Sequence, residues 1–348
     1  MYLLGVAKTW ILYGAYGETG QFVSTHAVAL GLQPVLAGRD PDRLAALADK
    51  LGLEHRPCTL DDPEGLDAML SDATLVINCA GPFVATAMPL VEACLRTGTH
   101  YLDLCGDFRV LERIQDCDAE ARERGVLLLP GVGFSVIPTD CVALRLHEAL
   151  PTGDRLELAI FNGLALTRGT VASMLDRLAA GRLVRREGQL VRLAEPSLRM
   201  IMFNRREIPC VPIACAELVS AYQSTGIPNI TVYFQTLEHR GVAVRDLDRL
   251  AEILSASLDA GSPRSLERSG VWGRLVNREG ERAEATLDLP DNLAFTATAA
   301  CEIVCRILED EVQQAVGATT PSRLFGSQFV LDLPGVGGFG LRRELRST

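Results

Sequence analysis

The stretch that decides the fold is Ile11-Leu12-Tyr13-Gly14-Ala15-Tyr16-Gly17-Glu18-Thr19-Gly20, where an apolar run breaks into three glycines. A segment with apolar residues at helical spacing follows it, from Gln21 to Leu30. Such a change of pattern predicts a strand, a tight turn and the start of a helix. Glycine is needed in this turn because a phosphate must approach bare backbone at the N-terminus of the helix. We therefore expect an anion at this turn.

The glycine spacing is G-x-x-G-x-x-G, a variant of the dinucleotide fingerprint G-x-G-x-x-G. Its place near the N-terminus, between a strand and a helix, favours a nucleotide site, and the alternative is a turn with a structural role alone. No Gly-Lys-Ser/Thr follows, which excludes a kinase-like phosphate loop. The cofactor-binding residues predicted here are Gly14, Tyr16, Gly17, Glu18, Thr19 and Gly20.

The second strand, predicted for 34–37, ends in Gly38-Arg39-Asp40, where the adenosine ribose of a dinucleotide lies. A guanidinium binds a 2′-phosphate with paired hydrogen bonds, so Gly38 and Arg39 favour NADP(H). NAD(H) is the less favoured alternative, which Asp40 supports because a carboxylate accepts hydrogen bonds from both ribose hydroxyls. It equally fits the cap of a helix that begins at Pro41.

Helices and strands then alternate. We expect helices over 41–51, 61–70, 87–97 and 110–124, and strands near 55–59, 73–79, 99–104 and 126–129. Alternation of this kind over about 130 residues predicts an α/β domain with a doubly wound parallel sheet.

Ligands of such sheets lie at the carboxyl ends of the strands. The fourth strand ends in Asn78-Cys79-Ala80-Gly81-Pro82-Phe83, and Asp103 stands at the end of the fifth. We assign all seven residues to the cofactor site, with the backbone of Gly81 and Pro82 close to the cofactor and Phe83 against its nicotinamide end. The alternative is an ordinary loop that caps the core.

The second half of the chain has a different composition of elements. A glycine-rich crossing loop, 130–140, leads to a helix over 141–150. Strands are expected at 156–161, 229–236 and 270–289, a hairpin at 183–193, and helices at 169–180 and 293–308. This pattern predicts a second domain of α+β type on a mostly antiparallel sheet. We expect domains at 1–132 and 133–318, and a tail, 319–348, that packs on the cleft or the first domain, with a strand at 329–333 and disorder after Gly340.

Composition limits the classes of function. The 348 residues are 48% hydrophobic and carry a formal net charge of -10, which argues against binding to nucleic acid or to an anionic membrane surface. No window of about 18 apolar residues predicts a membrane span. Residues 1–10 do not fit a signal peptide, since Lys8 follows the short apolar run.

The ten cysteines form no C-x-x-C pair and lie mostly among apolar residues. They predict buried thiols in a reducing compartment, hence a cytoplasmic protein. Cys301 and Cys305 lie one helical turn apart, but two further ligands are missing, so we expect a core helix face there and no metal site.

Several of these motifs, in this order, resemble the saccharopine dehydrogenase-like oxidoreductases. The resemblance rests on 14–20, on Leu36-Ala37-Gly38-Arg39, on 78–83, on Tyr101-Leu102-Asp103 and on Gly133-Phe134-Ser135-Val136-Ile137-Pro138-Thr139-Asp140. In the second half, 167–174, 224–229 and Thr320-Pro321-Ser322 resemble the branch that contains the trans-acting enoyl reductases. The resemblance implies an N-terminal Rossmann domain, a C-terminal substrate and dimerisation domain, and NADP(H).

The family reading implies a reductase that transfers hydride to an activated double bond of a small acyl or amino-acid-like substrate. An enoyl C=C bond is preferred, and an imine C=N bond of the saccharopine type is the alternative. A non-catalytic sensor that binds NADP(H) is the competing class of function. Fold and family fix the cofactor and the reaction class, not the substrate.

The reaction also requires a proton donor near the strand edge. Tyr101, Asp107, Ser135 and Asp140 are the candidates, and each has a structural alternative as a core, cap or turn residue. Arg168, Thr170 and Ser173 stand in a loop that leads into a helix, a suitable place for a substrate carboxylate or thioester oxygen or for an ordinary cap.

A basic segment runs through the second half of this acidic chain. Its arginines are 177, 182, 185, 186, 192, 199, 205 and 206. They form either a solvated face or a docking surface for an acidic carrier protein that delivers the acyl substrate. An exposed sheet edge in the second domain makes a homodimer plausible.

Overall fold

A computed structural model describes residues 8–161, 181–194, 198–236, 269–309, 311–312 and 314–344. The chain divides into two compact units. The first unit comprises Met1–Cys105, Arg109–Ser135 and Leu293–Leu324, and the second comprises Gly106–Phe108, Val136–Asn292 and Phe325–Thr348.

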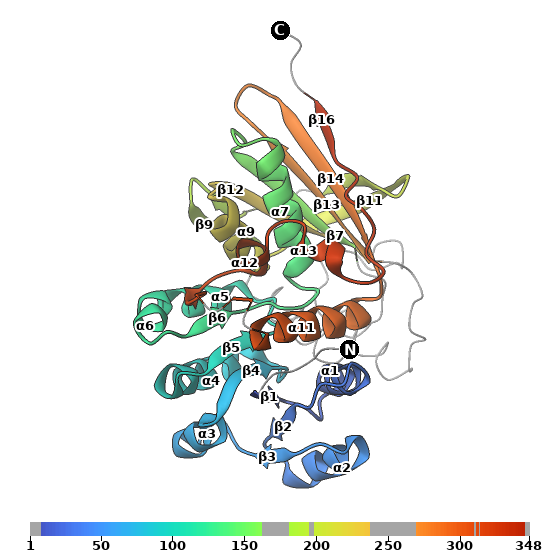
Figure 1. The fold of residues 1–348 in the computed structure, drawn as a ribbon. Helices are drawn as coiled ribbons and strands as arrows, with labels where there is room; N and C mark the ends of the chain where they lie inside the picture. Colours follow the sequence, from blue (N-terminus) through green and yellow to red (C-terminus); the bar gives the residue numbers. More distant parts are fainter. Residues whose placement is uncertain are drawn as a thin grey trace. The chain divides into compact units, whose positions relative to one another are not determined.

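The first unit is built on a parallel sheet (Figure 1). Its strands are β1 Thr9–Tyr13, β2 Val35–Gly38, β3 His55–Pro57, β4 Ala73–Asn78, β5 His100–Asp103, β6 Leu127–Leu129 and β15 Gly317–Ala318. Their order is β15-β6-β5-β4-β1-β2-β3, and each neighbouring pair is parallel. Counted from β3 to β6, this is the 3-2-1-4-5-6 order of dinucleotide-binding sheets, in which the direction of winding switches between β1 and β4. The predicted doubly wound sheet is confirmed.

Helices connect these strands. They are α1 Glu18–Ala29, α2 Pro41–Leu51, α3 Pro63–Leu70, α4 Phe83–Thr97, α5 Phe108–Asp116 and α6 Asp118–Glu123, with α11 Asn292–Leu308 and α12 Pro321–Phe325 from later in the chain. The bounds of α2 follow from its ends, since Asp40 and Pro41 open it and Gly52, at φ 67°, closes it. The single helix predicted over 110–124 is wrong, because the chain breaks it at Cys117 into α5 and α6.

The core of this unit consists of the strands and the apolar faces of the helices. Ile11, Leu12 and Leu36 are fully buried, as a sheet covered on both faces requires. Cys301 and Cys305 are buried on α11, which confirms the predicted core face of that helix.

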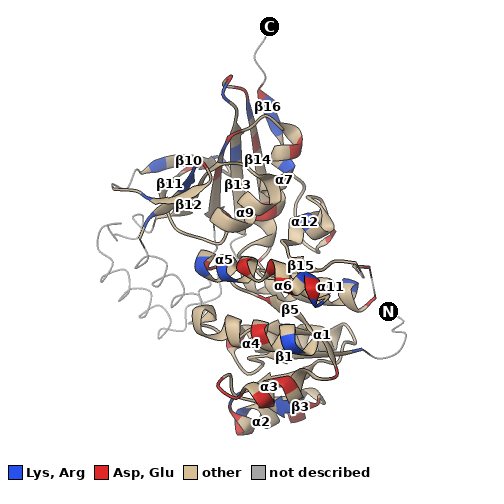
Figure 2. Cartoon of the chain, turned by 90° about the vertical axis from the view of Figure 1, so that its left-hand side faces the viewer, with Lys and Arg blue, Asp and Glu red and all other residues tan. Residues whose placement is uncertain are grey.

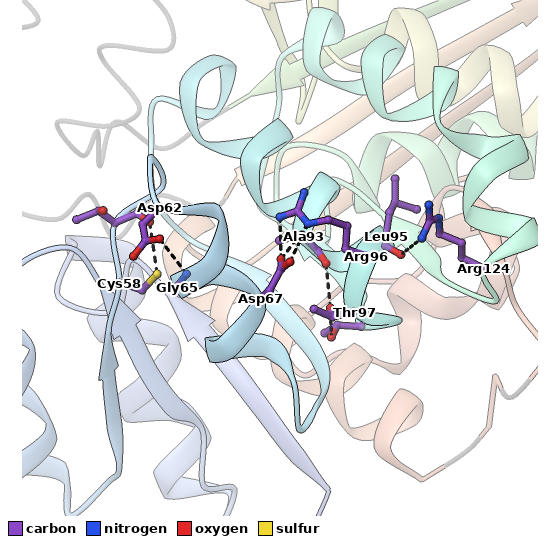
Figure 3. A network of polar contacts seen from close by, with 11 residues as sticks. Cys58, Asp62, Gly65, Asp67, Ala93, Leu95, Arg96, Thr97 and Arg124 are labelled. Carbon is purple, nitrogen blue, oxygen red and sulfur yellow. Dashed lines mark hydrogen bonds and ion pairs between the residues drawn. The ribbon is translucent and has the colours of Figure 1, made fainter.

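An ion pair joins α3 and α4 at the surface of the unit. Figure 2 shows acidic residues on α3 and residues of both signs on α4. Figure 3 shows the pair that results, in which Arg96 of α4 donates from Nη2 to Asp67 of α3 at 2.7 Å. The Asp62 carboxylate accepts from the Gly65 backbone and caps α3. Both side chains of the ion pair are more than a third exposed, so it contributes at most about 1 kcal/mol to stability.

The second unit is built on a nine-stranded mixed sheet. Its strands are β7 Arg155–Phe161, β8 Leu183–Arg186, β9 Gln189–Arg192, β10 Arg199–Phe203, β11 Arg206–Pro212, β12 Asn229–Gln235, β13 Ser269–Val276, β14 Arg282–Leu289 and β16 Arg342–Glu344. The order is β10-β11-β12-β7-β13-β14-β16, with β8 and β9 joined through β12. Only β12 and β7 pair in parallel among these described strands, so the predicted mostly antiparallel sheet is confirmed.

Three helices of this unit lie in the described part of the chain: α7 Ile137–Ala149, α9 Glu217–Thr225 and α13 Phe329–Asp332. Helix α7 packs closely on the sheet, because a Cβ on Gly273 of β13 would lie 2.7 Å from Val142. The predicted hairpin at 183–193 is confirmed as β8 and β9, with Glu187 and Gly188 at positive φ in the turn.

The tail differs from its prediction in two respects. The strand predicted at 329–333 is wrong, since Phe329–Asp332 forms helix α13 with Phe329 packed against Phe325. The disorder predicted after Gly340 is wrong for Arg342–Glu344, which pairs with β14 as β16. Apolar residues at alternate positions do not distinguish a short strand from one turn of helix.

The two compact units are not contiguous in sequence, whereas the predicted domains, 1–132 and 133–318, are. Helix α11 and strand β15 fall in the first unit, because β15 pairs with β6. The chain from Phe325 onward falls in the second unit. The helix predicted over 169–180 lies outside the described residues. Searched over those described residues, the structure has no helix with the length and apolar character that a membrane crossing requires.

Candidate cofactor and active site

The glycine turn between β1 and α1 brings three backbone segments together. Gly14 has φ 79°, and a Cβ there would lie 2.7 Å from the backbone nitrogen of Ala80, in the loop after β4. A Cβ on Gly20 would lie 2.3 Å from the carbonyl oxygen of Gly14. The first glycine thus lets the β4 loop approach, and the third lets α1 pack against the turn.

The same turn leaves the N-terminus of α1 open. Gly17 is the N-cap residue and brings no side chain to occupy the first-turn N–H groups. Its own N–H donates to the Gly14 carbonyl at 3.0 Å, which fixes the turn. Glu18 is exposed, and Tyr16 and Thr19 are half-buried around the opening. Backbone without side chains and the first-turn N–H groups of a helix together fit a pyrophosphate.

The end of β2 carries the predicted selectivity residues. The ring of Tyr16 lies against Gly38, and a Cβ at this position would be 2.7 Å from the ring. A larger residue would therefore displace Tyr16. Arg39 is exposed, and none of the residues that the structure describes forms an ion pair with it. Asp40 accepts from the Arg43 backbone at 3.1 Å, so its carboxylate caps α2, one of the two roles predicted for it.

Sequence reasoning missed Arg43. Its guanidinium lies 4.5 Å from the centre of the Tyr16 ring and donates to the Tyr16 carbonyl at 3.4 Å. A second arginine therefore lies near the end of β2, because the Tyr16 ring that it contacts also lies against Gly38. The signal was present in the sequence, since Arg43 follows Arg39 by one helical turn at the start of a helix.

A buried hydrogen-bond network links the carboxyl ends of β4, β5 and β6. Asn78 accepts from the Ala80 N–H at 2.9 Å and donates to the Tyr101 hydroxyl at 3.4 Å. Tyr101 donates to Asp103 at 2.9 Å. The other oxygen of Asp103 accepts from the backbone of Cys105 at 2.9 Å and of Gly131 at 2.8 Å.

Asp103 is an unusual carboxyl group because it is fully buried. Burial raises its pKa to about 6, and the donors from Gly131, Cys105 and Tyr101 oppose that rise. The same burial raises the pKa of the Tyr101 hydroxyl well above its ordinary value, so this tyrosine stays protonated.

The loop after β4 combines buried and exposed residues. Cys79 is buried, its backbone N–H donates to the Tyr13 carbonyl at 2.8 Å, and burial raises the pKa of its thiol. Gly81 and Pro82 are exposed and joined by a cis peptide bond. Phe83 is half-buried as the first residue of α4.

The four candidate proton donors have different environments. Tyr101 is fully buried, whereas Ser135 is half-buried at the end of the first unit. Asp107 and Asp140 are buried in the second unit, where Asp140, in the first turn of α7, accepts from Ser224 at 2.6 Å. The substrate candidates Arg168, Thr170 and Ser173 lie outside the described residues.

Comparison with known proteins finds a family that is similar to the first part of the chain. The sequence model of the family described as "Saccharopine dehydrogenase NADP binding domain" matches residues 10–129. These residues are similar to a saccharopine dehydrogenase NADP-binding domain. The match confirms the predicted resemblance to the saccharopine dehydrogenase-like proteins. It also supports the predicted cofactor, NADP(H).

Relatives of this chain carry two kinds of name. A saccharopine dehydrogenase-like oxidoreductase of Rattus norvegicus is 33% identical over 150 residues, which cover 37% of this chain and 35% of that protein. A trans-acting enoyl reductase of Mycobacterium ulcerans is 32% identical over 160 residues, 44% of this chain and 38% of that protein. The matches thus span little more than a third of the length of these relatives.

The fold comparison extends further along the chain. Saccharopine dehydrogenase (L-Glu forming) of Saccharomyces cerevisiae has a TM-score of 0.65 and covers 97% of this chain and 100% of its own, at 13% identity. At that identity the likeness shows the fold alone. It confirms the predicted architecture of a parallel dinucleotide-binding sheet followed by a second sheet-based unit.

Proposed function

We propose that the chain is an NADPH-dependent reductase that transfers hydride to an activated double bond of a small acyl or amino-acid-like substrate. One observation carries the proposal: a bare glycine turn and an open helix N-terminus lie at the point where the 3-2-1-4-5-6 sheet switches direction. NADPH supplies the hydride when bound. The chain must hold the acceptor carbon, neutralise developing charge and donate a proton.

The residues of the first domain divide the work of holding the cofactor. The backbone of 14–20 binds the pyrophosphate, and Arg39 with Arg43 receives the 2′-phosphate. The loop 78–83 borders the nicotinamide end. Among the proton-donor candidates we favour Ser135, because it is half-buried, whereas the hydroxyl of Tyr101 is held by Asp103.

For the substrate, we propose reduction of an enoyl C=C bond, with an imine C=N bond as the alternative. The name of the Mycobacterium ulcerans relative supports the first, and the names of the saccharopine dehydrogenase relatives support the second. NADPH that carries deuterium at the transferred position separates the two when it is incubated with enoyl thioesters and with imines of amino acids. Deuterium at the β-carbon of an acyl product supports enoyl reduction, and deuterium beside nitrogen supports imine reduction.

A non-catalytic sensor is the competing function. It predicts tight NADPH binding while all deuterium stays on the cofactor. Tyr101 and Asp103 are buried and hydrogen-bonded, which is compatible with either function. The deuterium-transfer experiment therefore decides between a reductase and a sensor.

We further propose that a carrier protein delivers the substrate to the basic segment. Arg185 is buried against Tyr222 and Arg199 pairs with Glu157, so neither serves a partner. Arg186, Arg192, Arg205 and Arg206 are exposed, and Figure 2 shows basic residues on β10 and β11. Reversing the charges of Arg205 and Arg206 should raise KM for a carrier-bound acyl substrate and leave KM for the free thioester unchanged. Equal KM values of wild type and variant for the carrier-bound substrate would contradict the proposal.

The ten free cysteines support a reducing, cytoplasmic compartment for this reaction.

A further inference from the structure

The carboxyl edge of the first sheet has two halves, and a buried network of side chains joins the three strands of one half. In dinucleotide-binding sheets each half receives one mononucleotide, with the adenosine ribose at the end of β2. The half formed by β4, β5 and β6 therefore receives the nicotinamide mononucleotide. In this chain the network of Asn78, Tyr101 and Asp103 lies beneath that half.

Each end of the network holds backbone of a loop at this edge. Asn78 accepts from the Ala80 N–H, and Thr86 of α4 donates to the Ala80 carbonyl at 2.5 Å. Asp103 accepts from the N–H groups of Cys105 and Gly131, which stand in the loops after β5 and β6. One network thus fixes three loops.

In this network the Tyr101 side chain connects Asn78 at one end to Asp103 at the other. Its hydroxyl accepts from Asn78 and donates to Asp103, and its ring is fully buried in β5. Ala80 also lies against Gly14 of the glycine turn, so the position of the β4 loop reaches the turn that takes the pyrophosphate. Loss of the hydroxyl leaves a buried amide and a buried carboxylate each short of a partner.

We propose that Asn78, Tyr101 and Asp103 are positioning residues that hold the loops after β4, β5 and β6 in the form that receives the nicotinamide half of NADP(H). The inference rests on the proposed function for its assignment of the nicotinamide to this half of the edge. None of the three residues needs to touch the cofactor. Their contribution should appear in affinity for the nicotinamide half and not in affinity for the adenosine half.

The test compares two ligands on the full chain by titration calorimetry. NADPH contains both halves, whereas 2′,5′-ADP contains only the adenosine half with its 2′-phosphate. For Tyr101→Phe we expect the Kd of NADPH to rise about tenfold, the effect of one lost buried hydrogen bond, while the Kd of 2′,5′-ADP stays within twofold. Thr86→Val, a milder change at the Asn78 end, should give a smaller shift of the same kind and serves if Tyr101→Phe fails to fold.

Thr99→Val is the matched control. Thr99 is buried immediately before β5, and its hydroxyl donates to the Leu70 carbonyl at 3.2 Å, at the opposite end of the strand from the proposed site. This variant should lose comparable stability and keep both Kd values.

Three results would overturn the inference. A Tyr101→Phe protein in which both Kd values rise equally, or neither rises, would mean that the network supports the fold alone. A wild-type chain that binds neither ligand would remove the cofactor site itself, and this failure of the proposed function is distinguishable because it appears before any variant is made.

Discussion

At the scale of single residues, we propose that Arg39 and Arg43 select NADPH over NADH. Arg39 is exposed at the end of β2, while Arg43 is held by the ring and carbonyl of Tyr16. Charge-assisted hydrogen bonds to a phosphate contribute about 1.5–3 kcal/mol, so Arg39→Ala should weaken NADPH binding by about 10- to 100-fold. Arg43→Ala should have a smaller effect. NADH, which lacks the 2′-phosphate, should bind both variants as it binds the wild type, and an equal loss for both cofactors would contradict this assignment.

Asp103 gives a pH dependence of stability. Its pKa is raised from 3.8 to about 6 by burial, so the folded state binds more protons than the unfolded state between these values. Its contribution is therefore fully present below about pH 4 and is lost as pH rises through 6, by at most about 3 kcal/mol. Tyr101, Cys105 and Cys79 are the titratable groups that interact with it, and burial keeps the Tyr101 and Cys79 groups protonated throughout this range.

Denaturant unfolding of wild type and Asp103→Asn between pH 4 and pH 7 measures this contribution. The stability of the variant relative to wild type should increase as pH rises, because asparagine has no proton to lose. A constant difference across the range would show that Asp103 is already ionised at pH 4.

At the scale of elements, the turn from β1 to α1 depends on space as well as backbone angle. Gly14 and Gly31 both have positive φ, at 79° and 82°, but only a Cβ on Gly14 would meet other atoms within 4 Å. Gly31→Ala should therefore cost about 1–2 kcal/mol, the penalty of the left-handed conformation alone. Gly14→Ala should cost more and abolish NADPH binding, because the loop at Ala80 must move. Equal unfolding free energies for the two variants would contradict the close approach.

Strand β7 carries the main electrostatic link of the second sheet. Glu157 accepts from Arg199 of β10 and from Arg274 of β13 at 2.8 Å, and all three side chains are less than a third exposed. Glu157→Gln leaves two guanidinium groups without their carboxylate, so unfolding free energy should fall by about 1–3 kcal/mol. Glu284→Gln on β14 removes the same charge where no such pair exists among the described residues, and it should change stability by less than about 0.5 kcal/mol. Similar losses for both variants would show that net charge, not pairing, is responsible.

Much of the first unit could be predicted from these elements. Continuous apolar strands, capped helices and the glycine turn are local signals, so Asp40 and Pro41 fixed the start of α2. The network of Asn78, Tyr101 and Asp103 could not be predicted, because it depends on the register of three strands. The position of Arg43 near Arg39 is evident in the sequence, but its contact with the Tyr16 ring depends on packing that no local pattern encodes. The return of β15 to β6 is a pairing between distant segments that no local pattern encodes.

At the scale of the whole molecule, we expect a homodimer through strand β10. This strand stands at one end of the described sheet, and Leu198, Met200 and Met202 on or beside it are about half exposed. An apolar edge strand invites pairing with another strand, and a second copy in antiparallel orientation presents the same edge. Light scattering should give twice the mass of the chain for wild type and the monomer mass for Met200→Lys combined with Met202→Lys. Leu30→Lys, which changes an exposed apolar residue of the first unit, should remain dimeric.

We propose that the backbone between Gly14 and Gly20 holds NADPH, and the proposed reductase function depends on that binding. Titration calorimetry of the wild-type chain with NADPH and with NADH measures it. We predict saturable binding of one NADPH per chain, tighter than that of NADH. Absence of measurable heat with both cofactors would show that the glycine turn binds neither.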